Sequence, residues 1–173
     1  MKHIILIGFK NAGKTVVGKG LAKKLGREFL DLDAEIEKKE GMTAREIVLK
    51  EGEMYFRNRE AETLKEITRN TGNTSIIALG GGAAMAEENQ KVIREHIVVL
   101  VTAPKEIVFE RIMKKGRPAF FPKDLPDREA FEKLYAEREV AYERIAKIRI
   151  KNEKSVESAV EEIIRILNLE YRI

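Results

Sequence analysis

A glycine-rich octet near the N-terminus contains the residue types needed to hold phosphate groups. Residues 8–15 read Gly-Phe-Lys-Asn-Ala-Gly-Lys-Thr, which follows the pattern G-x-x-x-x-G-K-[ST] directly after the apolar run 3–7. Glycines in such a loop let backbone N–H groups turn toward phosphate oxygens, and the N-terminus of the next helix adds positive potential. We therefore expect a phosphate-binding loop (P-loop) in which Lys14 reaches the β- and γ-phosphates and Thr15 binds Mg²⁺. The alternative is a glycine-rich turn with no ligand, which the strand–loop–helix context disfavours.

Two aspartates stand close together in a chain that otherwise prefers glutamate. Asp31 and Asp33 flank Leu32, and they are two of only four aspartates in the sequence. Alternate residues of a strand point to the same side, so both carboxylates would meet beyond the carboxyl end of a strand at 28–32, where open α/β sheets bind ligands. One carboxylate would hold Mg²⁺ through water, and the other would orient a substrate hydroxyl or accept its proton. The alternative is that Asp33 only caps the helix that follows.

An arginine and a glutamate form a third candidate group. Arg57 and Glu60 are three residues apart on a predicted helix and therefore share a face, where Glu60 could hold the guanidinium in position. An exposed surface pair with no function is the alternative.

Three successive glycines follow the apolar run 75–79. Gly80, Gly81 and Gly82 lose much conformational entropy on folding, which is tolerable where the backbone approaches a ligand or needs a positive φ. A plain tight turn rarely needs three.

The elements that must position these residues alternate between strands and helices along the chain. Short, β-branched apolar runs predict strands, and longer periodic stretches predict helices. The expected strands are 3–7, 28–32, 75–79, 97–101 and 147–150, and the expected helices are 14–25, 33–40, 43–70, 87–95, 104–115, 127–145 and 155–168. Thr43 and Glu46 form a capping box at the start of one helix. This alternation predicts a mostly parallel α/β sheet with helices on both faces.

One long stretch has no periodic pattern. Residues 114–127 contain three of the four prolines and two adjacent phenylalanines. Irregular segments of this length usually carry function, so we expect a lid.

The composition excludes several kinds of site. The length of 173 residues suits one domain of about 150 residues or slightly more. With no cysteine, disulfides, iron–sulfur clusters and thiol nucleophiles are impossible, and only two histidines disfavour a histidine metal cage. The net charge of +4 is spread along the chain and only 6% of residues are aromatic, which does not fit nucleic-acid binding. No run approaches the ~20 apolar residues of a membrane span, so we expect a cytoplasmic protein without a membrane partner.

In their order and spacing, these motifs resemble those of the shikimate kinases, a branch of the P-loop kinases related to nucleoside monophosphate kinases. The resemblance spans residues 4–150 and includes Arg117-Pro118 in the irregular segment and Arg138 on a late helix. It implies a single kinase domain over 1–173 with a three-layer fold: a five-stranded parallel sheet in the order 2-3-1-4-5, helices on both faces, and a lid at about 114–127.

The resemblance also assigns roles to individual residues. The implied catalytic residues are Lys14, Asp33 and Arg117. The implied ATP-binding residues are Gly8, Asn11, Ala12, Gly13, Lys14, Thr15, Val16, Arg111 and Arg117, of which Arg111 lies against adenine. The implied shikimate-binding residues are Asp33, Arg57, Gly80, Gly81, Gly82 and Arg138, and the two arginines bind the carboxylate. Thr15 and Asp31 are implied for Mg²⁺.

Three short segments depart from the family's usual residues. Asn11 replaces a glycine, Ala119-Phe120-Phe121 replaces leucines after Pro118, and Val140-Ala141 stands where a proline is usual. Asparagine tolerates left-handed backbone geometry, so the P-loop should still form.

The function expected from the resemblance is ATP-dependent phosphorylation of a shikimate hydroxyl, giving shikimate 3-phosphate and ADP on the route to chorismate and the aromatic amino acids. We expect a monomer. Two alternatives stay open: a related P-loop kinase for another hydroxy acid or a gluconate-type substrate, and a module that binds ATP without transferring phosphate.

Overall fold

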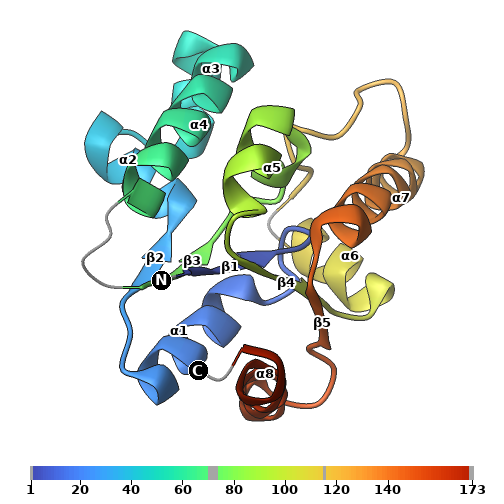
Figure 1. Cartoon of the computed structure of the whole chain (residues 1–173). Coiled ribbons are helices and arrows are strands. Elements are labelled where there is room, and N and C mark those ends of the chain that lie inside the picture. Colours follow the sequence, from blue (N-terminus) through green and yellow to red (C-terminus); the bar gives the residue numbers. More distant parts are fainter. Residues whose placement is uncertain (1, 70–73, 115, 172–173) are drawn as a thin grey trace.

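Five parallel strands form the centre of the molecule (Figure 1). The structure is a computed structural model that describes residues 2–69, 74–114 and 116–171. The strands are β1 (Ile4–Ile7), β2 (Phe29–Asp31), β3 (Ile76–Ala78), β4 (Ile97–Thr102) and β5 (Ile148–Lys151). Their order is β2-β3-β1-β4-β5, which confirms the predicted topology.

The helices cover both faces of this sheet. In Figure 1, α1 and α8 lie on one side of the strands, while α5, α6 and α7 lie on the other, and α2, α3 and α4 form a group beyond β2. The helices are α1 (Lys14–Leu25), α2 (Leu32–Glu40), α3 (Ala44–Glu51), α4 (Glu53–Arg69), α5 (Glu87–Ile93), α6 (Lys105–Met113), α7 (Asp127–Ile145) and α8 (Val156–Tyr171), with a 3-10 turn η1 (Ala83–Met85).

The alternation of side chains along the strands divides the core in two. Ile4 and Leu6 of β1 pack in the cluster formed with α1 and α8, whereas Ile5 and Ile7 pack in the cluster on the opposite face. The central strands are therefore buried on both faces, as their unbroken apolar runs predict. Strand β5 alternates between buried and exposed residues, as expected for an edge strand.

The predicted helix at 43–70 is wrong in one respect, since the chain forms two helices there. The predicted capping box is present, with the Glu46 N–H donating to Thr43 Oγ1 and the Thr43 N–H donating to the Glu46 carboxylate. Helix α3 then ends at Gly52, whose φ of +92° glycine adopts without strain and other residues do not. Residue 70, the last of the predicted range, lies outside the described residues. The break separates α4, which carries Arg57, from α3.

The segment that joins α6 to α7 is irregular, as predicted for the lid, and its residue 115 lies outside the described residues. Its Phe121 is 2% exposed and belongs to the main core cluster, so part of this segment is anchored. No helix among the described residues is long and apolar enough to cross a membrane.

Two histidines lie together at the amino end of the sheet. His3 and His96 immediately precede β1 and β4, and their rings meet edge to face with centroids 5.0 Å apart. Both are buried, and the Ser75 N–H donates to His3 Nδ1 at 3.0 Å. Burial lowers the pKa of each imidazole below its ordinary value, and at His96 the charge of His3 lowers it further.

This pair predicts a loss of stability in mild acid. Because the native pKa of each histidine is lowered, the unfolded chain binds more protons as the pH falls below the unfolded value of about 6.5, and unfolding is favoured there. We expect the melting temperature of the wild type to fall more steeply between about pH 7 and 5 than that of a His3→Asn/His96→Asn variant. In this variant, the asparagine that replaces His3 can still accept a hydrogen bond from the Ser75 N–H. Thermal unfolding at a series of pH values measures this, and parallel curves for the two proteins would contradict it.

Candidate active site

The P-loop joins β1 to α1 at the carboxyl edge of the sheet. Gly8 has a φ of +141°, and a Cβ placed there would lie 2.2 Å from the Val101 carbonyl oxygen of β4, so only glycine fits. Asn11 adopts a left-handed φ of +65°, as predicted for the residue that replaces a glycine. Gly13 precedes α1 with no side-chain cap, which leaves the backbone N–H groups of the first turn available to an anion.

Lys14 is buried inside this loop. The residue is 8% exposed, and Nζ donates to the carbonyl oxygens of Gly8 at 2.8 Å and Phe9 at 2.9 Å. Burial lowers the pKa of Lys14 to about 8, against the opposing charges of Asp33 and Asp31. The ammonium is charged at neutral pH, and a phosphate oxygen would be a stronger partner than the two carbonyls.

The two aspartates reach the site by a route that differs from the predicted one. Strand β2 ends at Asp31, and Asp33 lies in the first turn of α2, so the prediction that they alternate on one strand is wrong. They still share one neighbourhood, because the charges of both act on Lys14. The Thr15 hydroxyl donates to Asp31 Oδ2 at 3.0 Å, so the two residues expected at the metal are already in contact.

Asp33 has a carboxylate oxygen without a partner. Its Oδ1 is buried and accepts no hydrogen bond within the part of the chain that the structure describes. Burial, followed by the charge of Asp31, raises the pKa of Asp33 above its ordinary value. The alternative that Asp33 caps α2 is wrong, because Asp31 occupies the cap position and neither side chain makes a capping bond. A buried acceptor of this kind suits a donor from a ligand, such as a hydroxyl.

The Arg57–Glu60 pair is not a surface pair. Arg57 Nη1 lies 2.6 Å from Glu60 Oε2, and the Glu60 side chain is 1% exposed while that of Arg57 is 34% exposed. Arg57 also bonds to Glu53 at 3.1 Å. The carboxylate is thus buried behind the guanidinium and holds it at the surface of the site.

The three glycines let the backbone lie close to the charged side chains. None of them has a positive φ, so that reason for the three glycines is wrong. What the structure shows is a close approach of this backbone to charged side chains. A Cβ on Gly80 would lie 2.5 Å from Asp33 Oδ1, and one on Gly82 would lie 2.7 Å from Arg57 Nη1. At Gly81 a Cβ would be 3.1 Å from the Lys10 backbone nitrogen and 3.6 Å from Arg138 Nη1.

Arg138 projects from α7 toward these glycines. It is partly buried, and burial lowers the pKa of its guanidinium from the ordinary value. On the same helix, Tyr142 is buried and its hydroxyl donates to the Gly81 carbonyl oxygen at 2.5 Å, which fixes α7 against the glycine segment.

Two other predicted ATP-binding residues make different contacts. Arg111 at the end of α6 donates to the Asn11 carbonyl oxygen of the P-loop at 3.2 Å. Arg117 donates instead to the carboxylate of Asp127 and to the carbonyl oxygens of Pro122 at 2.6 Å and Leu125 at 2.9 Å. All of these hydrogen bonds of Arg117 lie within the lid segment and the start of α7.

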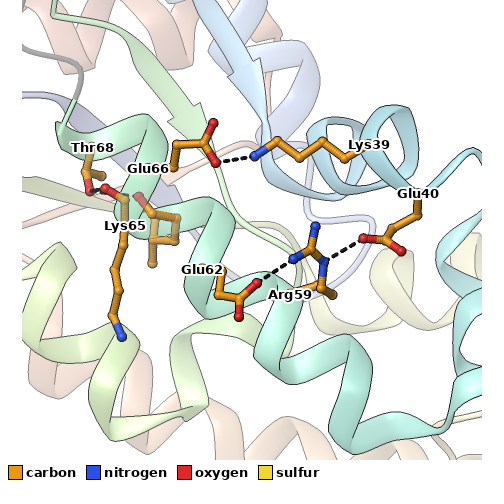
Figure 2. Close-up of polar contacts among 8 residues, drawn as sticks. Lys39, Glu40, Arg59, Glu62, Lys65, Glu66 and Thr68 are labelled. Atoms are coloured by element: carbon orange, nitrogen blue, oxygen red, sulfur yellow. Dashed lines mark hydrogen bonds and ion pairs between the residues drawn. The ribbon is translucent and has the colours of Figure 1, made fainter.

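Ion pairs brace the helices that carry Asp33 and Arg57. Figure 2 shows Arg59 of α4 bonded to Glu40 of α2, at 2.5 Å, and to Glu62 of its own helix. Lys39 of α2 also reaches Glu66 of α4 at 2.5 Å. These contacts tie the end of α2 to α4, so Asp33 and Arg57 sit on one connected unit.

Sequence reasoning missed Asn152. Its side-chain amide donates to the Ala12 carbonyl oxygen at 3.2 Å and fills the position where a Cβ of Gly13 would lie, 2.2 Å from Nδ2. Asn152 directly follows β5, so a polar residue at the carboxyl end of a strand was the available signal.

Comparison with known proteins identifies the family. The family model described as "Shikimate kinase" matches residues 10–168. The chain belongs to the shikimate kinase family. A shikimate kinase of Pelotomaculum thermopropionicum is 38% identical over 170 residues, with 96% of each chain covered.

Solved structures agree with this membership. Shikimate kinase from Acinetobacter baumannii in complex with shikimate matches with a TM-score of 0.87 and 35% identity, covering 98% of this chain and 95% of that one. Shikimate kinase from Aquifex aeolicus matches with a TM-score of 0.83 and 34% identity, covering 96% of each chain. The expected fold and family are therefore confirmed, and the protein has the activity of an ATP-using shikimate kinase.

The contact between Gly80 and Asp33 gives a prediction. A Cβ at Gly80 would lie 2.5 Å from Oδ1, 3.1 Å from Oδ2 and 3.2 Å from Cγ of Asp33, so Gly80→Ala must displace the carboxylate. Misplacement of a reacting group by about 1 Å costs on the order of 10²-fold, and we expect a fall in kcat of that size. Steady-state kinetics measure it. Gly20→Ala on α1, where a Cβ meets only the side chains of Val160 and Val156, is the control that should keep its activity; a normal kcat for Gly80→Ala would refute the expectation.

Proposed function

We propose that this site transfers the γ-phosphoryl group of ATP to a shikimate hydroxyl that is oriented by Asp33, giving shikimate 3-phosphate and ADP on the route to chorismate and aromatic amino acids. The observation that carries the proposal is the buried, unpartnered Oδ1 of Asp33 beside Gly80. Burial raises the pKa of Asp33, which makes it a better proton acceptor than an ordinary aspartate.

The nucleotide half of the site is the P-loop and its neighbours. Backbone N–H groups around Gly13 would hold phosphate oxygens, and Lys14 would turn from its carbonyl partners to the β- and γ-phosphates. Arg111 lies beside the loop, where it would face adenine. The remaining proposed contacts come from Gly8, Asn11, Ala12, Thr15 and Val16.

Thr15 and Asp31 fit a magnesium ion. A hydroxyl and a carboxylate in contact at 3.0 Å are hard oxygen ligands of the kind that Mg²⁺ prefers, so Thr15 and Asp31 would hold the ion. When bound, the ion would neutralise charge on the phosphates.

The acceptor half has positive charge suited to the shikimate carboxylate. Arg57 and Arg138 lie against Gly82 and Gly81, and guanidinium groups pair with carboxylates through two parallel hydrogen bonds. A carboxylate held there, with Asp33 at the neighbouring Gly80, would place a ring hydroxyl between the acid-binding arginines and the P-loop.

Phosphoryl transfer needs little covalent work from the protein, so these residues act by positioning and by charge. Lys14 would stabilise the charge on the transferring group, and Arg117 would join it when the lid closes over the ligands. To do so, Arg117 must exchange Asp127 and the two carbonyl oxygens for phosphate oxygens.

The proposal includes one cytoplasmic kinase domain that acts as a monomer. Among the described residues, the exposed large apolar side chains are spread over six helices; they are Val16, Leu49, Met54, Tyr55, Ile107, Val140 and Leu169. Size-exclusion chromatography with light scattering tests the oligomeric state.

A substrate panel tests the proposed chemistry. We expect ADP release with ATP, Mg²⁺ and shikimate, and far less with quinate or gluconate, because both arginines and Asp33 must be engaged together. Lys14→Ala should reduce turnover by at least about 10²-fold while the protein stays folded. A preference for gluconate would favour the related-kinase alternative, and ATP binding without ADP release would favour the non-catalytic module.

The lid gives a separate prediction for Arg117. If its charge acts mainly in the transition state, Arg117→Ala lowers kcat by roughly 10²-fold or more and changes either KM only modestly. Arg128→Ala is a matched control, because Arg128 is another exposed arginine near the lid whose ion pairs, with Glu106 and Glu132, lie outside the site. A near-normal kcat for Arg117→Ala would remove its catalytic role.

A further inference from the structure

Arg138 lies between two aromatic rings. Its guanidinium carbon is 5.2 Å from the ring centroid of Phe9 and 5.0 Å from that of Phe120. Phe9 belongs to the P-loop, Phe120 to the lid segment and Arg138 to α7. Three parts of the chain that are distant in sequence therefore meet at one side chain.

The rings are the close neighbours of a charge that has no counterion. Among the residues that the structure describes, no carboxylate lies within ion-pair distance of Arg138, whereas Arg57 has both Glu53 and Glu60. An aromatic face attracts a guanidinium, and it does so without occupying the N–H groups at the guanidinium edge. Tyr142 is the polar side chain beside Arg138, and the donors that it does not engage stay available to a ligand. Nη1 already lies beside Gly81.

We infer that Phe120, with Phe9 on the P-loop, positions Arg138 for the substrate carboxylate, so that the seating of the lid sets the affinity for shikimate. The inference rests on the proposed role of Arg138 in binding that carboxylate. Phe120 is a positioning residue here and acts on the substrate only through Arg138.

Phe120 is the better residue to test. Phe9 is 4% exposed and packs against Phe131 and Tyr135, so replacing it would disturb the core. Phe120 is only partly buried, and its aromatic contacts are Phe121, Arg138 and the ammonium of Lys10, 5.6 Å from its centroid. It is also one of the phenylalanines that replace the family's usual leucines in the lid.

A double-mutant cycle on the full-length enzyme provides the test. We expect Phe120→Leu to weaken shikimate binding by about 5- to 30-fold, the range for losing a desolvated cation–π contact, with ATP affinity unchanged. Phe120→Tyr, which keeps the ring, should restore most of the affinity. Because Phe120 acts through Arg138, the Phe120→Leu/Arg138→Ala double variant should bind shikimate no more weakly than Arg138→Ala alone.

Phe109→Leu is the matched control. Phe109 is a partly buried ring that carries a guanidinium in the same way, with Arg128 4.9 Å from its centroid, and that arginine is outside the site. The Phe109→Leu variant should keep its affinity for shikimate, even if the protein becomes less stable. Isothermal calorimetry with shikimate and with ATP gives the affinities, and thermal unfolding shows that each variant is folded.

The outcomes separate this inference from the proposed function. Normal shikimate binding by Arg138→Ala would show that the carboxylate role of Arg138 is wrong, and the inference would fall with it. A large loss in Arg138→Ala with no loss in Phe120→Leu, or losses that add in the double variant, would overturn the inference alone. Equal losses of shikimate and ATP affinity in Phe120→Leu would do the same, since they would indicate a general structural effect.

Discussion

A buried ammonium constrains the architecture of the whole site. Lys14 is 8% exposed, and a charge in that position is tolerated only because the surrounding backbone and carboxylates compensate it. Gly8 supplies a carbonyl oxygen from a position where only glycine fits beneath β4. Asp31 comes from the end of β2 and Asp33 from the start of α2, so the compensation needs β2 and β1 held in one sheet through β3. The P-loop therefore supplies the carbonyl oxygens that stabilise the buried ammonium, and the strand order brings the two carboxylates close to it.

Much of this arrangement could be predicted from the sequence because it depends on local patterns. The run 3–7, the octet 8–15 and the periodic stretch 14–25 predict β1, the P-loop and α1, and helix α1 has the predicted bounds. In these segments propensity, burial and loop chemistry agree. The predicted strand order came from the family resemblance, which also added Arg111, Arg117 and Arg138 to the site residues that the local motifs had indicated.

The features that could not be predicted depend on one residue's backbone geometry or on long-range contacts. Gly52 divides the expected helix at 43–70, although a single glycine within a helical pattern is often tolerated. Asp33 lies on a helix because β2 ends two residues earlier. Its Oδ1 lies so close to Gly80 that this position has no room for a Cβ, and no local pattern indicates that contact. The meeting of Phe9, Phe120 and Arg138 is invisible to any local pattern, because it joins the P-loop, the lid and α7.

The contact of Asn152 with the P-loop has a consequence for synthesis of the chain. The phosphate-binding loop occupies residues 8–15, yet the side chain that fills the space at Gly13 comes from residue 152, after β5. Domains fold as units while the ribosome adds roughly 5–20 residues each second, so the packing of this loop is complete only after residue 152 has been added. A nascent chain that has not reached residue 152 therefore lacks a finished nucleotide site, and bound ATP can stabilise the fold fully only after that residue is in place.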